Sequence, residues 1–187
     1  LFYFLANKVL GVSIGYKEPE EIPWEGIYHP KADRIFRDIK EYLSWYKPKN
    51  APTIGILFFR HYWINDNLEV EDLLIYELEK RGFNVISIFA YSLKDKSLGT
   101  KGTEEIIEEW LIDEKGNPRI DLLIKLIFFF LQSSRESGFE KREIAEAGVE
   151  LLKKLNVPVI APVISYYKTI EEWEKEELNL DIGWAIA

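Results

Sequence analysis

Thr53-Ile-Gly-Ile-Leu-Phe-Phe59 is the stretch that decides the fold, because it is apolar at nearly every position and not only at every second one. This pattern is typical of a strand covered on both faces, as in parallel sheets whose connecting helices lie above and below. Further stretches along the chain share the pattern. They are Asn84-Val-Ile-Ser-Ile-Phe-Ala90, Ile120-Asp-Leu-Leu-Ile-Lys-Leu-Ile127 and Val157-Pro-Val-Ile160. We therefore predict a buried parallel sheet.

Amphipathic stretches with helical spacing separate these strands. One covers 70–78 and stops near Gly82, one covers 106–111 with Thr103 as its N-cap, and one covers 144–155. Right-handed crossover connections place such helices on both faces of the sheet. The sequence thus predicts an α/β fold, a flavodoxin-like doubly wound parallel sheet of at least four strands.

The organisation of the chain changes near residue 50. Residues 1–50 form an appended segment of loops and a helix, the latter indicated by apolar spacing over 35–46. Two prolines in the linker 47–52 end that helix before the first strand. Residues 51–187 form the flavodoxin-like domain, with a last helix expected near Thr169 from its capping-box spacing. The final residues are apolar without a turn or polar tail, so we expect this domain to be truncated at its C-terminus.

The composition narrows the class of protein. The chain has 187 residues, a formal net charge of −8, and neither cysteine nor methionine. The negative charge disfavours nucleic acids and anionic membranes as partners. The lack of cysteine excludes disulfides and thiolate metal sites, and it fits a reducing compartment, so we expect a cytoplasmic protein. The longest apolar run, 122–131, has about half the length that crosses a bilayer, so no membrane span is expected.

Polar residues follow each predicted strand. In an open parallel sheet the carboxyl ends of the strands form the ligand-binding edge, so these residues should converge on one rim. Loops at such ends are polar in any case because they are exposed, and an ion pair with a nearby acid is the alternative for Arg60. The candidate substrate-binding residues are Arg60, Asn65, Ser92, Lys94, Ser165, Tyr166 and Tyr167, and the candidate catalytic residues are His61 and Asp66.

Several common sites are absent from the sequence. The two histidines, His29 and His61, lie far apart without metal-ligand spacing, so we expect packed or rim histidines and no metal site. Gly-rich nucleotide loops and serine-hydrolase motifs are missing, and 99–103 has the wrong spacing for a phosphate loop. We interpret 99–103 as the entry to a helix, and we predict no tightly bound cofactor.

Five groups of short motifs occur in one order along residues 26–187, and together they resemble the large subunit of the tetrapyrrole metal chelatases. This family includes the CobN subunit of cobaltochelatase and the H subunit of magnesium chelatase. The motifs are Gly26-Ile-Tyr-His-Pro30 with Glu41-Tyr-Leu-Ser-Trp-Tyr46, Ile54-Gly-Ile-Leu-Phe-Phe-Arg60, Leu78-Glu-Lys-Arg-Gly-Phe-Asn-Val85, Tyr91-Ser-Leu-Lys-Asp95, and Ile160-Ala-Pro-Val-Ile-Ser165 with Glu171-Glu-Trp173.

The resemblance implies a ligase that forms nitrogen–metal bonds. It would insert Co²⁺ into hydrogenobyrinic acid a,c-diamide in cobalamin biosynthesis, or Mg²⁺ into protoporphyrin IX. The metal is then a substrate, and ATP is hydrolysed by separate AAA+ partner subunits. Family members are much longer, so this chain would be an internal piece, inactive by itself. Magnesium-type chains tend to have Arg-Ser-His where this chain has Arg60, His61 and Tyr62, so His61 is offset.

The resemblance also suggests roles at the rim. Metal insertion removes two pyrrole N–H protons, so the site needs a base, groups that hold the carboxylates of the macrocycle, and aromatic walls. We assign carboxylate binding to Arg60 and Lys94, ring contact to Tyr166 or Tyr167, and proton or metal transfer to His61 or Asp66. Two alternatives remain open: a non-catalytic scaffold whose rim contacts neighbouring domains, and an unrelated flavodoxin-like domain that binds a small molecule.

Overall fold

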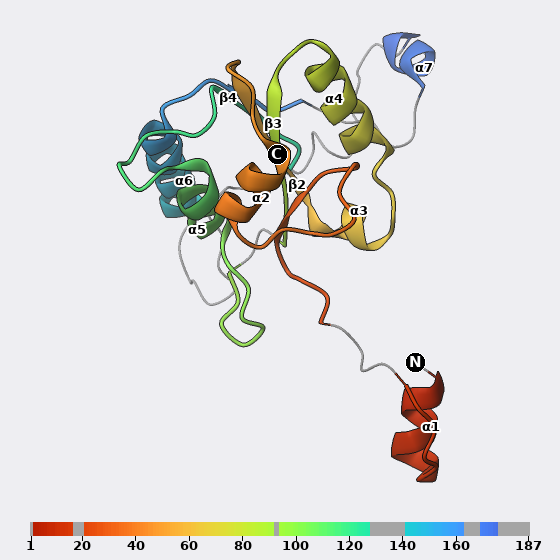
Figure 1. Cartoon of the computed structure of the whole chain (residues 1–187). Coiled ribbons are helices and arrows are strands. Elements are labelled where there is room, and N and C mark those ends of the chain that lie inside the picture. Colours follow the sequence, from red (N-terminus) through yellow and green to blue (C-terminus); the bar gives the residue numbers. More distant parts are fainter. Residues whose placement is uncertain (1, 17–20, 92–93, 128–140, 163–168, 176–187) are drawn as a thin grey trace.

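The computed structural model describes residues 2–16, 21–91, 94–127, 141–162 and 169–175. At its centre is a five-stranded sheet in the order β1-β3-β2-β4-β5. Figure 1 shows the whole chain, with β2, β3 and β4 of this sheet labelled. The strands are β1 (Gly26–Tyr28), β2 (Thr53–Phe59), β3 (Asn84–Ala90), β4 (Leu122–Lys125) and β5 (Val159–Ile160). The helices are α1 (Phe2–Leu10), α2 (Ile39–Tyr46), α3 (Arg60–Ile64), α4 (Glu69–Lys80), α5 (Thr103–Ile106), the π-helical turn η1 (Ile107–Leu111), α6 (Lys141–Leu155) and α7 (Ile170–Lys175).

The strand order confirms the predicted flavodoxin-like α/β fold. Four strands pair in parallel, in the spatial order β3-β2-β4-β5. When only these parallel strands are numbered along the chain, this order is 2-1-3-4. This is the beginning of the flavodoxin-like order, whose switch point lies here between β2 and β4. The edge strand β1 pairs antiparallel with β3, and the sequence analysis did not predict it.

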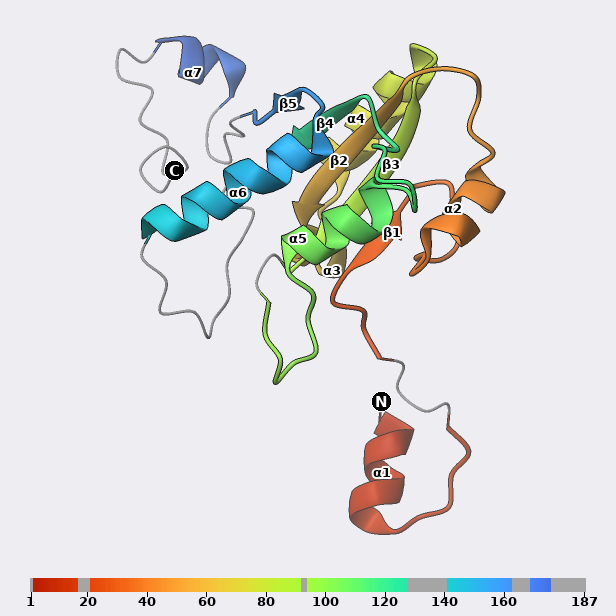
Figure 2. The same cartoon turned by 90° about the vertical axis from the view of Figure 1, so that its left-hand side faces the viewer.

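Two central strands provide the core. Every residue of β3 and all but the first residue of β2 are buried, as their continuous apolar pattern predicts. Helix α4 lies on one face of the sheet, and α5 and α6 lie on the other (Figures 1 and 2). Helix α1 has no buried residues and lies apart from the sheet. None of the described helices is long and apolar enough to cross a membrane.

The helices differ from the predicted ranges mainly at their ends. Helix α4 stops just before Gly82, whose φ of +91° suits glycine, as predicted. Helix α5 has Gly102 and not Thr103 as its N-cap. The helix predicted over 35–46 begins only at residue 39, because the Asp38 carboxylate accepts the first free N–H groups of α2.

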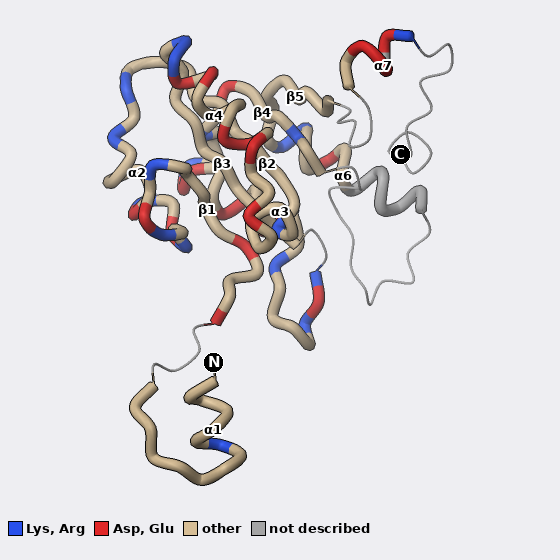
Figure 3. The backbone as a smooth tube through the Cα atoms, turned by 90° about the vertical axis from the view of Figure 1, so that its right-hand side faces the viewer, with Lys and Arg blue, Asp and Glu red and all other residues tan. Residues whose placement is uncertain are grey.

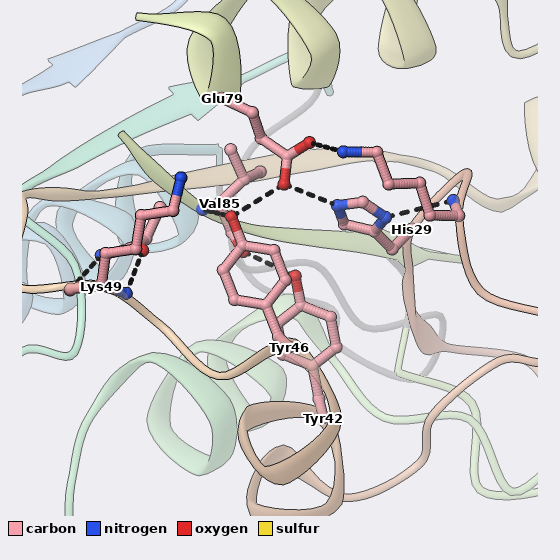
Figure 4. A network of polar contacts seen from close by, with 8 residues as sticks. His29, Tyr42, Tyr46, Lys49, Glu79 and Val85 are labelled. Carbon is pink, nitrogen blue, oxygen red and sulfur yellow. Dashed lines mark hydrogen bonds and ion pairs between the residues drawn. The ribbon is translucent and has the colours of Figure 1, made fainter. Parts of the chain in front are cut away.

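Tyrosines of α2 complete the edge of β3 where β1 does not reach. Strand β1 pairs with Ser87–Phe89, which leaves the backbone of Val85 facing the same side without a strand partner. The Tyr42 hydroxyl donates to the Val85 carbonyl at 2.6 Å, and the Val85 N–H donates to the Tyr46 hydroxyl at 3.1 Å (Figure 4). Burial raises the pKa of both phenols, that of Tyr46 to about 12, so both hydroxyls keep their protons.

Candidate functional site

Arg60 lies at the carboxyl end of β2, as predicted, but its guanidinium is engaged by the N-terminal segment. Its Nε donates to the carbonyl of Pro23 at 2.7 Å, and a terminal nitrogen lies 3.4 Å from the carbonyl of Ile22. The guanidinium also stacks over the ring of Trp24, 4.1 Å from its centroid. Residues 22–24 therefore cover Arg60 and close this part of the rim.

Three of the predicted site residues, His61, Asn65 and Asp66, lie in α3 or just after it, and all three are exposed. His61 stacks on Phe59, with centroids 5.2 Å apart, and partial burial lowers its pKa, which favours the neutral imidazole. Asn65 is the C-cap of α3, and its backbone N–H donates to the carbonyl of His61. Asp66 has a φ of +55°, a left-handed conformation that asparagine and aspartate tolerate better than most residues. The structure places these side chains at the predicted edge of the sheet.

Lys94 forms an ion pair across the same edge. Its Nζ lies 2.5 Å from Oε1 of Glu105, whose other oxygen accepts the N–H of Gly102 at the start of α5. Lys94 is thus joined to the N-terminus of α5 and is half exposed. The other predicted residues lie outside the described part of the chain, namely Ser92, Ser165, Tyr166 and Tyr167.

A hollow of about 270 Å³ opens beside Arg60, at the carboxyl edge of the sheet, and the sequence analysis did not identify it. Its aromatic walls are Trp24 and Trp110, and its charged groups include Glu25, Arg37 and Lys101. Trp24 and Glu25 precede β1, and Trp110 lies in η1. Single π-helical turns occur often at functional sites. We call these five residues the tryptophan hollow.

Two buried polar atoms of the tryptophan hollow have no hydrogen-bond partner among the described residues. They are Oε2 of Glu25 and the indole Nε1 of Trp110, whose side chain is 2% exposed. Buried polar groups are nearly always satisfied, so these two atoms are exceptions. Both atoms are covered by protein, so a ligand in the hollow would reach them only after a side chain moves. One is a hydrogen-bond acceptor when ionised and the other is a donor.

Burial and the neighbouring cations have opposite effects on the pKa of Glu25, and the effect of burial is the larger. Burial raises the pKa of Glu25, while the charge and the backbone N–H of Lys101 act in the opposite direction. The Lys101 ammonium lies 5.5 Å from the centroid of Trp110 and 2.6 Å from Oε2 of Glu109. The lining of the hollow therefore combines two acids, Glu21 and Glu25, with two cations and two indole rings. This set has aromatic surface, hydrogen-bonding groups of both charges and a carboxyl group of raised pKa.

Sequence signals for the tryptophan hollow existed but could be interpreted in other ways. Trp24 and Glu25 come directly before the Gly26-Ile-Tyr-His-Pro30 motif, and Lys101 lies in the glycine-rich loop that was interpreted as a helix entry. Trp110 belonged to an apolar helical stripe. Nothing in the sequence showed that β1 runs antiparallel, which brings its amino end to the carboxyl edge of β3.

The structure confirms that His29 is a packed histidine. It is 1% exposed, lies 5.3 Å from the ring centroid of Trp45 and approaches Glu79. In the described part of the chain no group of three or more His, Asp or Glu side chains could hold a metal ion.

The fold is that of a flavodoxin-like α/β domain, with the tryptophan hollow at the carboxyl edge of its sheet. A family model described as CobN/Magnesium Chelatase matches residues 1–187. The chain belongs to this family of chelatase large subunits, as the motifs suggested, and so the interpretation as an unrelated flavodoxin-like domain is set aside.

Individual relatives agree with the family. An uncharacterized protein of Methanocaldococcus jannaschii is 39% identical over 184 residues, which are 97% of this chain and 14% of that protein. The chloroplastic magnesium-chelatase subunit ChlH of Oryza sativa is 32% identical over 181 residues, 91% of this chain and 12% of that subunit. A solved structure, the catalytic subunit of cobaltochelatase from Mycobacterium tuberculosis, superposes with a TM-score of 0.55 at 18% sequence identity, which shows a shared fold. The match covers 96% of this chain and 13% of the mycobacterial chain. The chain thus spans only a small part of these proteins.

Proposed function

We propose that this chain forms part of the tetrapyrrole site in the large subunit of an ATP-dependent metal chelatase. The specific proposal is a cobaltochelatase that inserts Co²⁺ into hydrogenobyrinic acid a,c-diamide, with AAA+ ATPase subunits as its partners. The alternative is a magnesium-chelatase H-type subunit that acts on protoporphyrin IX. The observation that carries the proposal is the tryptophan hollow itself, in which two indole rings lie beside a carboxyl group and two cations. Two similar proteins support it, since the rice relative is a magnesium-chelatase subunit and the mycobacterial one is a cobaltochelatase subunit.

The residues of the hollow fit the chemistry of metal insertion. Two pyrrole N–H bonds break as the metal–nitrogen bonds form, so two protons must leave the macrocycle. The Glu25 carboxylate would accept one of them, and its raised pKa makes it a stronger base than an ordinary glutamate. The second proton would go to His61 or Asp66, the residues assigned to proton transfer, or to water. Arg37 and Lys101 would hold peripheral carboxylates, and the indoles would contact the ring. The volume lies below the roughly 300–1,000 Å³ of whole-ligand sites, so the hollow would take one edge of the macrocycle.

The roles assigned to Arg60 and Lys94 remain part of the proposal. To bind a substrate carboxylate, Arg60 would exchange its contacts with the carbonyls of Ile22 and Pro23. Lys94 would exchange its ion pair with Glu105. Both exchanges replace existing polar contacts of the protein, as would an exchange of the Lys101 ion pair with Glu109, so each of these cations would add only part of the affinity of a free one.

Binding titrations test the proposal directly. The folded chain is titrated with hydrogenobyrinic acid a,c-diamide and with protoporphyrin IX, following tryptophan fluorescence and pigment absorbance. We expect saturable binding that Lys101→Ala weakens about tenfold, since a charged hydrogen bond contributes about 1.5–3 kcal/mol. Lys153→Ala, an exposed lysine of α6, is the control and should leave the affinity unchanged.

The outcome also distinguishes the alternatives. Preference for the corrinoid supports the cobaltochelatase, and preference for the porphyrin supports the magnesium enzyme. Binding of neither pigment by the folded chain contradicts a tetrapyrrole site here and favours the scaffold role. In the assembled enzyme, Glu25→Gln should lower the rate of metal insertion by about 10²–10⁴ while binding persists, because only the proton acceptor is lost.

A further inference from the structure

A second and larger pocket lies at the opposite end of β3, where α2, the end of α4 and the linker to β2 meet (Figure 4). Its volume is about 590 Å³, well within the roughly 300–1,000 Å³ of small-molecule sites. Asn84, the first residue of β3, lines it, so the pocket is separate from the tryptophan hollow at the carboxyl edge.

The lining of this pocket is basic although the chain is acidic. Its cationic residues are Lys31, Lys47, Lys49 and Lys80, and Glu79 is the one acid among its lining residues. The net charge of the chain is −8, so the excess of lysines is a local feature. Figure 3 shows basic residues along the connection between α2 and β2. We call this site the lysine pocket.

Glu79 does not cancel the charge of the lysine pocket, because its own partners already surround it. Its carboxylate accepts from Lys31 at 2.6 Å and from the Tyr46 hydroxyl at 3.0 Å, and it lies 3.3 Å from Nε2 of His29. Burial raises the pKa of Glu79, but these hydrogen bonds and the nearby charges outweigh it and lower the pKa overall. The backbone N–H of Lys31 donates to Nδ1 of His29, which assigns the ring proton to Nε2.

The remaining lysines are free or weakly engaged. Lys47 and Lys49 are exposed and form no side-chain ion pair among the described residues. Lys80 lies 3.2 Å from Glu77, which does not line the pocket, and 60% of its side chain is exposed. Three ammonium groups are therefore available to an anion in the pocket.

The backbone beneath two of these lysines is fixed. The Asn84 side chain accepts the N–H of Lys49 at 2.8 Å and donates to its carbonyl at 2.9 Å. Lys47 ends α2 in a left-handed conformation with a φ of +54°, where glycine is the common residue. A lysine in this left-handed conformation costs about 1–2 kcal/mol relative to glycine.

We propose that the lysine pocket binds a nucleoside polyphosphate. Its cations are all lysines, and several lysine ammonium groups act as point charges that can bind the oxygens of a polyphosphate chain together. Trp45, Tyr76 and Phe83 supply aromatic surface against which a base stacks. This inference is independent of the proposed function, because it uses other residues at the other end of the sheet.

Isothermal titration of the whole chain with ATP and with inorganic triphosphate tests the inference. We expect saturable ATP binding that is at least about fivefold tighter than triphosphate binding, because triphosphate lacks the base. The double variant Lys47→Ala/Lys49→Ala should weaken ATP binding at least about tenfold, and the matched control Lys153→Ala/Lys154→Ala on α6 should not. If the first variant is less stable, Lys47→Gly removes one of the two charges, suits the backbone conformation, and should still weaken ATP binding.

The contrary outcomes are equally definite. Failure of the folded chain to bind ATP overturns the inference, as does equal weakening by both double variants. Triphosphate binding as tight as ATP binding overturns the assignment of a nucleoside. Glu25→Gln and Lys101→Ala should leave ATP binding unchanged, so the result does not depend on whether tetrapyrrole binds at the tryptophan hollow.

Discussion

Replacing Tyr42 by Phe should lower the free energy of unfolding by about 1–3 kcal/mol. Tyr42 and Val85 are both 0% exposed, and the Tyr42 hydroxyl donates to the Val85 carbonyl at 2.6 Å. The substitution keeps the ring, which stacks on Tyr46 at 5.3 Å, and removes the donor. The buried Val85 carbonyl then lacks this donor, at the part of the β3 edge that β1 does not cover. The decrease in the free energy of unfolding therefore measures how much the Tyr42 hydroxyl stabilises this edge.

Urea and thermal unfolding, followed by circular dichroism, measure this effect. For a chain of this size each kcal/mol shifts the melting temperature by roughly 2–4 °C, so the expected decrease is roughly 2–12 °C. Tyr76→Phe is the matched control, because Tyr76 is 55% exposed, and its effect should stay within about 0.5 kcal/mol. Equal stability of the two variants would refute the reasoning that hydroxyl groups close this edge.

Two further predictions concern the Gly26-Ile-Tyr-His-Pro30 segment. Burial lowers the pKa of His29 below its ordinary value, so the unfolded chain binds its proton more readily and stability should fall as the pH drops through about 6.5. Urea midpoints measured against pH should show a smaller decrease in His29→Gln, and an unchanged slope would contradict this. Gly26→Ala should cost about 1–3 kcal/mol, because the new Cβ would lie 2.8 Å from Phe89 and closer still to Ile35. Gly15→Ala, with nothing within 4 Å of its new Cβ, should leave the melting temperature unchanged.

The central fold could be predicted from the sequence because its signals are local. Strands β2 and β3 are apolar along nearly their whole length, and this pattern requires cover on both faces. Helix α4 has its own periodicity and stop signal at Gly82. Strand β1 has only three residues, and its pairing depends on the distant edge of β3, so no local pattern identifies it.

The candidate site at the carboxyl edge contains residues that the sequence analysis predicted and residues that it did not. The rule that ligands bind at the carboxyl ends of parallel strands led to Arg60 and Lys94, which do lie there. The rule cannot find Trp24 and Glu25, because they precede an antiparallel strand and reach the same edge from the opposite direction. Nor does sequence spacing reveal that Glu105 pairs with Lys94, since that contact depends on the path of the loop before α5.

Strand β1 connects the two proposed ligand sites. Glu25 precedes it in the tryptophan hollow, and His29 follows it in the lysine pocket. At about 3.3 Å per residue, the two residues are separated by roughly 13 Å of extended chain. Strand β1 is held on one side by its pairing with β3 and on the other by two backbone hydrogen bonds between Ile27 and Phe36. Because Glu25 and His29 flank this short strand, a Cβ added at Gly26 against Phe89 and Ile35 is expected to disturb both sites together.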